Sequence, residues 1–415
     1  MESIIIIGGG HAAAQLCASL VEAGLGPQVH LVCAEGHLPY QRPPLSKAYL
    51  KNPAEALQPH RGDAWYAQAG ITVHRSDPAV AIDRAAKKVR LQSGTELAYG
   101  HLVLATGARA RRTAGWPAGL ANVAVLRDAT DAGQCRALLV GASSLTVLGG
   151  GFIGLEVAGT ARALGLAVQV IEVAPRLLAR SVSAELAEHV LASHRATGIE
   201  VLLNARLGEA EHDGQRLLAL NVNGQRQPIE RLLLGIGAEP EVGLALAAGL
   251  AVDNGIVVDA AMRSSDPDIL AIGDVARFPV SPLWAPAGTL LRLESVQNAN
   301  DQARAAALTI QGQHPVYAAL PWFWSEQGAM RLQMAGLMPA PGSPGDLHPA
   351  SRHRRPGAND ASFSILHYVA DRLVCVESVN APMDHVMSRK LLEAGRHPAP
   401  ALACDPSVTL KSLLA

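Results

Sequence analysis

Apolar and polar positions follow one another along the chain in a pattern that predicts two β-α-β units of matching length. Residues 3–32 contain an apolar strand with a glycine-rich turn, "SIIIIGGG", an Ala- and Leu-rich helix, "HAAAQLCASLVEAG", and a second strand, "QVHLV". The same order returns in residues 145–172 as "LTVLGGG", "FIGLEVAGTARALG" and "LAVQVIE". Each unit is followed by an apolar strand that ends in a small-residue turn, "LVLATGARA" and "LLLGIGAEP". Repeated units of this kind predict two doubly wound α/β domains, or one such domain inserted into another.

The pattern changes twice after the second unit. The apolar strand "ILAI" (residues 269–272) leads into Gly273 and Asp274, and an Ala- and Gln-rich helix is expected over residues 295–310. From about residue 317 the chain has aromatic and β-branched strands, "PWFWSEQ", "RLQMAGL", "FSILHYV" and "RLVCVESVN", and then a helix near "DHVMSRKLLEAG". This part of the sequence predicts a separate α+β domain.

The predicted fold class is therefore α/β, with two Rossmann-like doubly wound domains of the glutathione reductase-like type and a C-terminal α+β domain. We expect a discontinuous first domain over residues 1–108 and 239–316, a second over residues 109–238, and the C-terminal domain over residues 317–415. The segment from 339 to 358 is rich in Pro, Gly and Arg and predicts an exposed loop. Its Arg352, Arg354 and Arg355 are interpreted as solvated charge rather than as a site.

Composition excludes several classes of protein. The chain has 415 residues, of which 49% are hydrophobic and 17% charged, enough for two or three cores. Its formal net charge of −1 lacks the basic field typical of nucleic-acid binders. The five cysteines form no closely spaced pair and no cluster with His at metal-ligand spacing, so we expect reduced thiols and no metal site. The chain shows no export signal and no apolar run long enough to cross a bilayer, and we expect a cytoplasmic protein.

The two glycine turns match the fingerprint of dinucleotide-binding sites. Gly8, Gly10 and Ala13 form one copy, and Gly149, Gly151 and Gly154 form the other. The first glycine makes a tight turn, the second lets backbone N–H groups approach a pyrophosphate, and the third small residue lets the helix pack on the strand. One such turn can occur for packing reasons alone. Two in register with strand, helix and a following acid predict two dinucleotide sites.

The acids that follow the turns, Glu35 and Glu172, stand where a carboxylate binds a ribose hydroxyl. A carboxylate at Glu172 repels a 2′-phosphate, and the sequence therefore favours NADH over NADPH. Arg176 and Arg180 follow closely enough to reach such a phosphate, which leaves NADPH as the alternative. Two dinucleotide sites in one chain suggest one tightly bound flavin dinucleotide and one exchangeable nicotinamide, with Asp274 as a contact of the flavin ribityl chain.

Six segments carry a family resemblance: "PYQRPPLSKAYL", "LVLATGA", "VLGGGFIGLEVA", "PDILAIGDVA", "LESVQNANDQARAAA" and "PWFWSEQ". Together and in this order they closely resemble the FAD-dependent NADH:ferredoxin reductases of bacterial oxygenase systems, the family of putidaredoxin, rhodocoxin and biphenyl dioxygenase reductases. The resemblance covers essentially the whole chain. It extends to apoptosis-inducing factor, which shares the fold.

The resemblance implies roles for the Pro-rich segment at residues 39–50. Arg42 is placed by the FAD phosphates or ribose, and Lys47 near N5 and O4 of the isoalloxazine, where a cation restrained by prolines would face developing negative charge. Glu156 is expected in the first turn of the second helix, and the resemblance implies that it is the ion partner of Lys47. A carboxylate at the helix start that faces the dipole is the simpler interpretation, and the two are compatible. Phe152 is implied to lie over the flavin until nicotinamide displaces it; a buried packing residue is the alternative.

The glycine turns, the acids that follow them and the family resemblance together imply the full set of cofactor contacts. For FAD they are Gly8, Gly10, Ala12, Ala13, Glu35, Val80, Thr106, Gly107, Arg127, Gly273, Asp274, Glu294, Ser295, Val296 and Trp324. For NAD they are Gly149, Gly151, Ile153, Gly154, Glu172, Arg180 and Gly237. Of these, Glu294, Ser295 and Val296 begin a helix whose N–H groups would face the O2 end of the flavin.

The resemblance implies electron transfer from NADH through FAD to a [2Fe–2S] ferredoxin, which in turn supplies a cytochrome P450 or a Rieske oxygenase. Ferredoxins are typically acidic, so a basic docking surface is expected, with Arg304, Arg389, Lys390 and Trp324 as candidates. One alternative is a disulfide reductase, NADH peroxidase or NADH oxidase, which is disfavoured because residues 36–50 contain no Cys. The other is a flavoprotein like apoptosis-inducing factor, with slow NADH oxidation and a signalling role.

Overall fold

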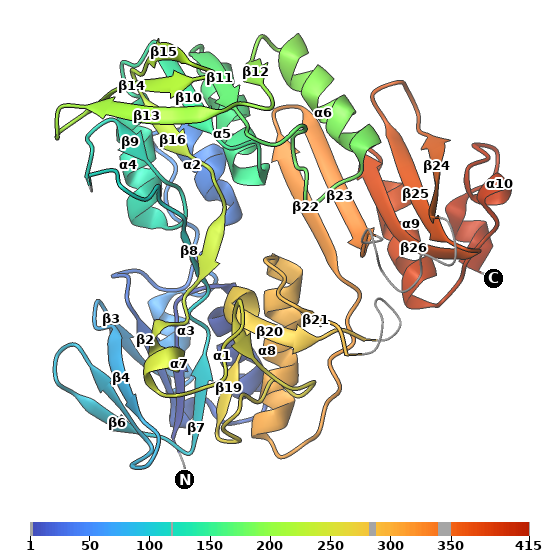
Figure 1. Cartoon of the computed structure of the whole chain (residues 1–415). Coiled ribbons are helices and arrows are strands. Elements are labelled where there is room, and N and C mark those ends of the chain that lie inside the picture. The colour runs from blue at the N-terminus through green and yellow to red at the C-terminus, as the bar shows by residue number, and fades with distance from the viewer. Residues whose placement is uncertain (1–2, 118, 282–287, 339–349, 415) are drawn as a thin grey trace. The chain divides into compact units, whose positions relative to one another are not determined.

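The computed structural model describes residues 3–117, 119–281, 288–338 and 350–414, which form two compact units (Figure 1). Unit 1 comprises Met1–Arg42, Leu57–Arg109 and Glu239–Pro321. Unit 2 comprises Pro43–Ala56, Ala110–Ala238 and Trp322–Ala415. The chain passes from one unit to the other within β8 (Ala108–Ala110) and β17 (Ala238–Pro240), and also after Arg42, Ala56 and Pro321. The finer division into three domains stays a prediction, because unit 2 holds both the second β-α-β unit and the C-terminal sheet.

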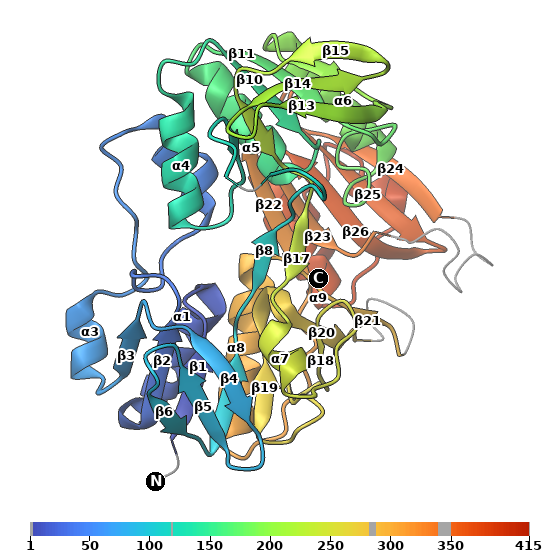
Figure 2. The same ribbon diagram turned by 60° about the vertical axis from the view of Figure 1, so that its left-hand side comes forward.

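Unit 1 contains the first predicted β-α-β unit, which the structure confirms. Its parallel sheet has the order β19-β7-β1-β2-β3, and all four residues of β1 are buried, as expected for a strand covered on both faces. The long helices α1 and α8 pack against each other beside this sheet (Figure 2). The bounds are β1 (Ile4–Ile7), α1 (His11–Glu22), β2 (Val29–Cys33), β3 (Thr72–Arg75), β7 (His101–Leu104), β19 (Ile269–Ala271) and α8 (Val296–Ile310).

The rest of unit 1 consists of short elements around this layer. The sheet β4-β5-β6 is antiparallel, and β18, β20 and β21 form a small mixed sheet next to the Gly273 turn. The bounds are η1 (Gly26–Gln28), α3 (Asp63–Gln68), β4 (Ala79–Asp83), β5 (Lys88–Leu91), β6 (Glu96–Ala98), α7 (Gly243–Ala247), β18 (Ile256–Val257), η3 (Gly273–Val275), β20 (Ala276–Pro279) and β21 (Leu290–Leu291).

Unit 2 contains the second predicted β-α-β unit, which the structure also confirms. Its parallel sheet has the order β12-β11-β10-β16-β9, and an antiparallel meander, β13-β14-β15, packs on it around Leu148, Ile171 and Leu234. The bounds are η2 (Pro43–Ser46), α2 (Ala48–Lys51), β9 (Val123–Ala124), α4 (Ala129–Leu139), β10 (Ser144–Leu148), α5 (Phe152–Ala163), β11 (Ala167–Ile171), α6 (Ala184–Ala196), β12 (Glu200–Leu202), β13 (Leu207–His212), β14 (Leu217–Val222), β15 (Gln225–Pro228) and β16 (Leu232–Leu234).

The C-terminal sheet of unit 2 is antiparallel with the order β22-β23-β26-β25-β24, and α9 packs on its central strands. Every strand predicted for this region is present, and so is the late helix. The bounds are β22 (Trp322–Gln327), β23 (Met330–Gly336), β24 (Ala350–Pro356), β25 (Phe363–Val369), β26 (Arg372–Val379), α9 (Pro382–Glu393), α10 (Pro400–Ala403) and η4 (Leu410–Leu414).

The prediction of an exposed loop before residue 358 is wrong for part of the segment. Ala350–Pro356 pairs with Phe363–Val369 along its whole length as β24. Arg355 is buried, and its guanidinium donates to the carbonyl oxygens of Ala403, Asp405 and Val408. It is therefore a structural cation that holds the C-terminal segment, not solvated charge. Residues 339–349 lie outside the described part of the chain.

His385 on α9 predicts an acid sensitivity of the C-terminal sheet. The ring is 2% exposed, and burial together with Arg389 and Arg331 lowers its pKa to about 4. Between about pH 6.5 and pH 4 the unfolded chain binds more protons than the folded one, so stability falls as the pH falls, by about 1.4 kcal/mol per pH unit for this group. We expect the His385→Leu variant to lose less unfolding free energy over this range than the wild type does.

The measurement is urea unfolding at pH 6.5 and at pH 4.5. His212→Leu, which changes an exposed histidine on β13, is the matched control and keeps the wild-type pH dependence. An unchanged slope in His385→Leu would contradict the assignment.

Among the described residues, no helix is long and apolar enough to cross a membrane.

Candidate dinucleotide sites and the Lys47–Glu156 pair

The first glycine turn joins β1 to α1 within unit 1. Gly8 has φ +133°, and a Cβ there would lie 2.1 Å from the carbonyl oxygen of Ala105, so the position requires glycine. A Cβ on Gly10 would meet only Arg42, at 3.9 Å. No side chain caps α1, so its first N–H groups are left for another acceptor. The turn therefore fits a bound anion such as a pyrophosphate.

The second turn, between β10 and α5 in unit 2, repeats this geometry. Gly149 has φ +107°, and its Cβ would lie 2.4 Å from the carbonyl oxygen of Gly235. A Cβ on Gly151 would have nothing nearer than 3.8 Å, and no side chain caps α5. Gly154 brings the helix against the turn, because its Cβ would lie 2.5 Å from the carbonyl oxygen of Gly149. The same division between structural glycines and one open glycine supports a second dinucleotide site.

The two acids after the turns make different contacts. Glu35 accepts hydrogen bonds from the guanidinium of Arg42 at 2.9 Å and from the hydroxyl of Tyr40 at 2.6 Å. Glu172 accepts from the backbone N–H groups of Gly150 at 2.6 Å and Ala174 at 2.7 Å. Glu172 is thus fixed beside its glycine turn, and Glu35 fixes Arg42. Their ribose contacts stay predictions.

The two arginines after Glu172 are not equivalent. The guanidinium of Arg176 donates to the backbone oxygens of Val182 and Ala179, at 2.6 and 2.7 Å. Arg180 is exposed and makes no hydrogen bond to a residue that the structure describes. Its Nη2 atom would lie 3.6 Å from a Cβ built on Gly237. Arg180 is therefore the cation of this pair that a phosphate can recruit.

His11, which sequence reasoning did not single out, is the first residue of α1. It is buried, its Nε2 lies 3.3 Å from Oε1 of Gln41, and burial and the neighbouring His60 lower its pKa to about 4. The imidazole is therefore neutral at pH 7 and adds no charge to the first turn.

Lys47 and Glu156 form an ion pair inside unit 2, with Nζ 2.6 Å from Oε2. Lys47 follows the 3-10 turn η2 and precedes α2, and its ammonium also donates to the Pro43 carbonyl at 3.1 Å. Within unit 2, two hydrogen bonds attach this segment to helices α5 and α4. Thr160 donates to the carbonyl oxygen of Ser46, and Arg136 donates to that of Tyr49, both at 2.8 Å.

Glu156 is not a carboxylate of the first helical turn, and that part of the prediction is wrong. Helix α5 begins at Phe152, so Glu156 is its fifth residue and lies beyond the first turn, where the dipole acts. Its side chain is 5% exposed. Besides Lys47, it accepts from the hydroxyls of Ser46 at 2.5 Å and Ser325 at 2.7 Å. A buried carboxylate with this many donors is held in one orientation.

The aromatic candidates lie on α5 and β22. Phe152 packs on Phe323 with ring centroids 4.6 Å apart, and Trp324 lies 5.6 Å from Trp322. Ile153 is exposed, so its side chain is available to a ligand at the second turn. Phe323, which sequence reasoning missed, shows that Phe152 has a packing partner here. A role over the flavin stays a prediction.

The Gly273 turn and the start of α8 lie together in unit 1. Gly273 donates its N–H to Oε1 of Gln302 at 2.7 Å, and the carbonyl of Asp274 accepts from Arg292. Ser295 caps α8 by accepting from the N–H of Asn298 at 3.1 Å. The oxygen of the Ser295 hydroxyl therefore serves as the helix cap, while Val296 begins the helix as predicted. Glu294 pairs with Arg292 at 2.6 Å.

The other residues assigned to the cofactors are spread over both units. Val80 is exposed on β4, the hydroxyl of Thr106 donates to the carbonyl of Glu241, and Gly107 has φ +70°. Ala12 and Ala13 are buried in α1. Arg127, just before α4, belongs to unit 2, as do Lys47 and Trp324. The remaining residues assigned to FAD belong to unit 1.

The basic residues predicted to dock a partner have contacts of their own. Arg304 pairs with Asp301 at 2.5 Å, and Arg389 lies 4.3 Å from the ring centroid of Trp322 and pairs with Glu393. Lys390 is exposed in the last turn of α9. Docking through these side chains stays a prediction.

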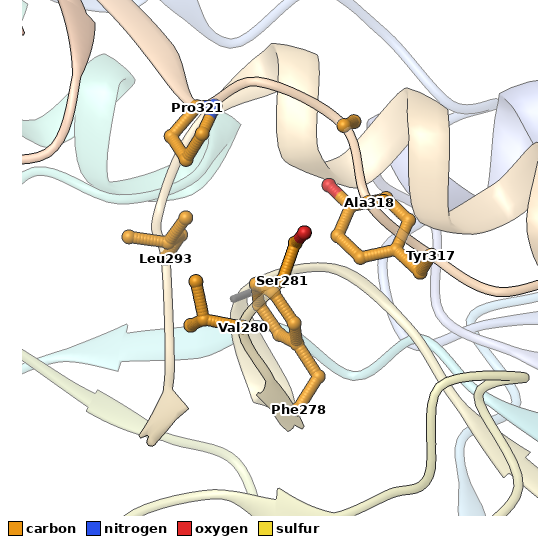
Figure 3. Close-up of a pocket in the computed structure, with 8 residues that line it drawn as sticks. Phe278, Val280, Ser281, Leu293, Tyr317, Ala318 and Pro321 are labelled. Carbon is orange, nitrogen blue, oxygen red and sulfur yellow. The ribbon is translucent and has the colours of Figure 1, made fainter. Parts of the chain in front are cut away.

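A small apolar hollow also lies in unit 1. Phe278, Val280, Leu293, Tyr317 and Pro321 line it, and Ser281 is a polar residue at its wall (Figure 3). None of its lining residues is charged. It is interpreted as a packing defect.

Comparison with known proteins places the chain in a family. The family model described as "Pyridine nucleotide-disulphide oxidoreductase" matches residues 2–303, and the one described as "Reductase C-terminal" matches residues 322–414. The chain belongs to the pyridine nucleotide-disulphide oxidoreductase family. The resemblance to ferredoxin reductases of oxygenase systems is confirmed by the individual relatives.

Rhodocoxin reductase of Rhodococcus erythropolis is 40% identical over 419 residues, which cover all of this chain and 94% of that protein. The ferredoxin reductase for the CYP199A2 system from Rhodopseudomonas palustris is similar with a TM-score of 0.92 and 39% identity, with full coverage of both chains. The reductase of the covalent putidaredoxin reductase–putidaredoxin complex gives a TM-score of 0.90 and 34% identity, over 100% of this chain and 98% of that one.

Proposed function

We propose that this protein is an FAD-containing reductase that takes electrons from NADH and passes them to a [2Fe–2S] ferredoxin, which supplies a cytochrome P450 or a Rieske oxygenase. The observation that carries the proposal is the pair of glycine turns, one in each unit. Each has one glycine that the backbone requires, one that is open to a ligand, and an uncapped helix behind it. Relatives over the full length of the chain are named as reductases of rhodocoxin and putidaredoxin.

The cofactors supply the redox chemistry, since a nicotinamide delivers electrons in pairs and a flavin can release them singly. The chain contributes binding and charge. The N–H groups at the start of α1 and α5 bind pyrophosphates, in unit 1 for FAD and in unit 2 for NADH. Lys47 supplies a fixed cation whose place is set by Glu156. Arg389 and Lys390 are proposed as part of the surface that meets an acidic ferredoxin.

The disulfide-reductase alternative is disfavoured by the cysteines themselves. Cys17, Cys33, Cys135 and Cys375 are buried, and all five thiols are unpaired. Burial raises the pKa of Cys33 and Cys135 to about 12, so neither forms the thiolate that disulfide exchange requires. Unpaired thiols also support our proposal that the protein works in the cytoplasm.

The test is anaerobic stopped-flow absorbance of the purified protein. Mixing with NADH is expected to bleach a bound flavin, and a second mix with a panel of [2Fe–2S] ferredoxins is expected to reduce one of them. Purification without flavin would refute the proposal. A persistent charge-transfer band with no electron transfer to any ferredoxin would favour the signalling alternative.

Glu172 and Arg180 together predict the choice of nicotinamide. Changing Glu172 to Gln removes the charge that repels a 2′-phosphate and leaves an amide oxygen that can still accept from the Gly150 N–H. We expect the ratio of kcat/KM for NADH to that for NADPH to fall about ten-fold, equivalent to about 1.4 kcal/mol. Steady-state kinetics with both cofactors measure it.

Arg180 provides the control for this change. In the Glu172→Gln, Arg180→Gln double variant, the gain toward NADPH is expected to disappear, because the unpaired guanidinium is the cation available to the 2′-phosphate. Arg176→Gln, which removes a guanidinium already bonded to backbone oxygens, would not have this effect. A preference that stays the same in Glu172→Gln would contradict the role of the carboxylate.

A further inference from the structure

Strand β22 of the C-terminal sheet presents alternate residues to the helices of the second β-α-β unit. Phe323 packs on Phe152 of α5, and two residues later the hydroxyl of Ser325 donates to Glu156, one helical turn further along α5. A Cβ on Gly159, the next position of this face, would lie 3.2 Å from the backbone N of Gly328. Alternate residues of a strand share one face, and residues three to four apart share one face of a helix. Successive contacts of β22 therefore meet successive turns of α5.

Ser325 is the last member of a chain of hydrogen bonds that points at Glu156. His194 of α6 lies with Nε2 2.8 Å from Oε1 of Gln327, which can only accept, so the imidazole is the donor. The amide of Gln327 donates to the hydroxyl oxygen of Ser325 at 3.3 Å, and that hydroxyl donates to Oε1 of Glu156 at 2.7 Å. Burial lowers the pKa of His194, which agrees with a neutral donor.

The direction of this chain fixes what Ser325 does. Its oxygen accepts from Gln327, so its single hydrogen is committed to the carboxylate. Ser325 is fully buried, and His194, Gln327 and Glu156 are each no more than 5% exposed, so no competing water is expected along the chain. Donors in series polarise one another toward the charge at the end.

The two oxygens of Glu156 have separate partners. Oε2 accepts from Lys47 and Ser46, whereas Oε1 accepts from Ser325 and, at the longer distance of 3.4 Å, from the backbone N–H of Glu326. Without the Ser325 hydroxyl, Oε1 keeps only the weak contact in a site closed to water. The carboxylate then turns or moves to recover a donor, and Oε2 no longer stays in place for Lys47.

We propose that Ser325 is a positioning residue for the Lys47–Glu156 pair, and that it acts through the carboxylate of Glu156. The inference deepens the proposed function, because it rests on Lys47 as the cation of the nicotinamide–flavin reaction. Strand β22 of the C-terminal sheet thereby takes part in that reaction through the hydroxyl of Ser325, which Gln327 and His194 orient by hydrogen bonds.

The test compares Ser325→Ala with Ser378→Ala in the purified full-length protein. Ser378 is equally buried, on β26 of the same sheet, and its hydroxyl bonds to Ser364 instead of the ion pair. The probe is the rate at which an amine-reactive ester acylates Lys47, read by peptide mass spectrometry. The other lysines, Lys51, Lys87, Lys88, Lys390 and Lys411, serve as internal references.

We expect acylation of Lys47 to become about three- to ten-fold faster in Ser325→Ala, because a side-chain nitrogen no longer held against a carboxylate is more accessible to the ester. The five reference lysines and the Ser378→Ala variant are expected to keep wild-type rates. Equal rates for Lys47 in both variants would overturn the proposal. So would a rise at all six lysines, which would indicate general loosening.

Two further variants keep the test decisive. Ser325→Cys has nearly the volume of serine but a weak donor, so it carries the same expectation if the alanine variant does not fold. In a Glu156→Gln background, Ser325→Ala is expected to add no further change at Lys47, since the residue acts through the carboxylate; additive effects would refute this. Acylation needs no redox turnover, so its outcome is independent of whether the protein binds flavin and reduces a ferredoxin.

Discussion

Replacing Lys47 by Met lowers the rate of flavin reduction by NADH by about 10²- to 10³-fold, which is the typical effect of removing one fixed charge or donor from a reacting centre. Three acceptors hold the ammonium in place: Oε2 of Glu156 at 2.6 Å, the Pro43 carbonyl at 3.1 Å and the hydroxyl of Ser46 at 3.3 Å. In its proposed place beside the flavin, it would need no reorganisation as negative charge develops there. Anaerobic stopped-flow absorbance measures the rate directly.

The matched control is Lys51→Met, one helical turn further on α2. Lys51 is exposed and makes no ion pair or hydrogen bond to Glu156, so its removal is expected to leave the rate within two-fold of the wild type. Flavin content of Lys47→Met should remain normal, because the glycine turn of unit 1 is intact. A Lys47→Met enzyme that is reduced as fast as the Lys51→Met enzyme would show that the cation has no part in the reaction.

The two β-α-β units could be predicted from sequence because their signal is local. Each needs a glycine at the end of a buried strand, where φ is positive at Gly8 and Gly149, and a small residue where the helix crosses the turn. These requirements involve residues that are close together in the sequence. The strand, the turn and the helix can therefore be recognised without knowing the rest of the fold.

The donors around Glu156 could not be predicted in the same way. Ser46 is 110 residues from Glu156 and Ser325 is 169 residues away. Alternation in "PWFWSEQ" shows which residues of the strand share a face, but not which helix that face meets. The resemblance supplied Lys47 as partner and gave no reason to expect the two serines.

The error at β24 has a related cause. Its sequence, "ASRHRRP", has low strand propensity, and a segment rich in Pro, Gly and Arg is typical of a loop. The strand forms because it pairs with β25 from Ala350 opposite Val369 to Pro356 opposite Phe363. Arg355 is buried at the same time, since three backbone carbonyls of the C-terminal segment satisfy its guanidinium. Tertiary pairing overrides local preference here.

The second glycine turn offers a way to separate folding from cofactor binding. Gly149→Ala places a methyl group 2.4 Å from the carbonyl oxygen of Gly235 in a backbone conformation that alanine rarely adopts. Gly151→Ala places one in ordinary van der Waals contact, 3.8 Å from the carbonyl oxygen of Gly235, with φ −84°. The two variants differ by two positions and carry the same chemical change.

We expect opposite outcomes from them. Gly149→Ala should destabilise unit 2 by about 3–5 kcal/mol or prevent its folding, from the clash and the disfavoured φ together. Gly151→Ala should cost about 1 kcal/mol or less as a helix cap, yet raise the dissociation constant for NAD⁺ about 10- to 100-fold, because the methyl group takes the space of the pyrophosphate. Thermal unfolding and calorimetric titration with NAD⁺ measure the two effects. Wild-type NAD⁺ affinity in a well-folded Gly151→Ala protein would show that the nicotinamide dinucleotide does not approach this turn, and the site in unit 2 would have to lie elsewhere.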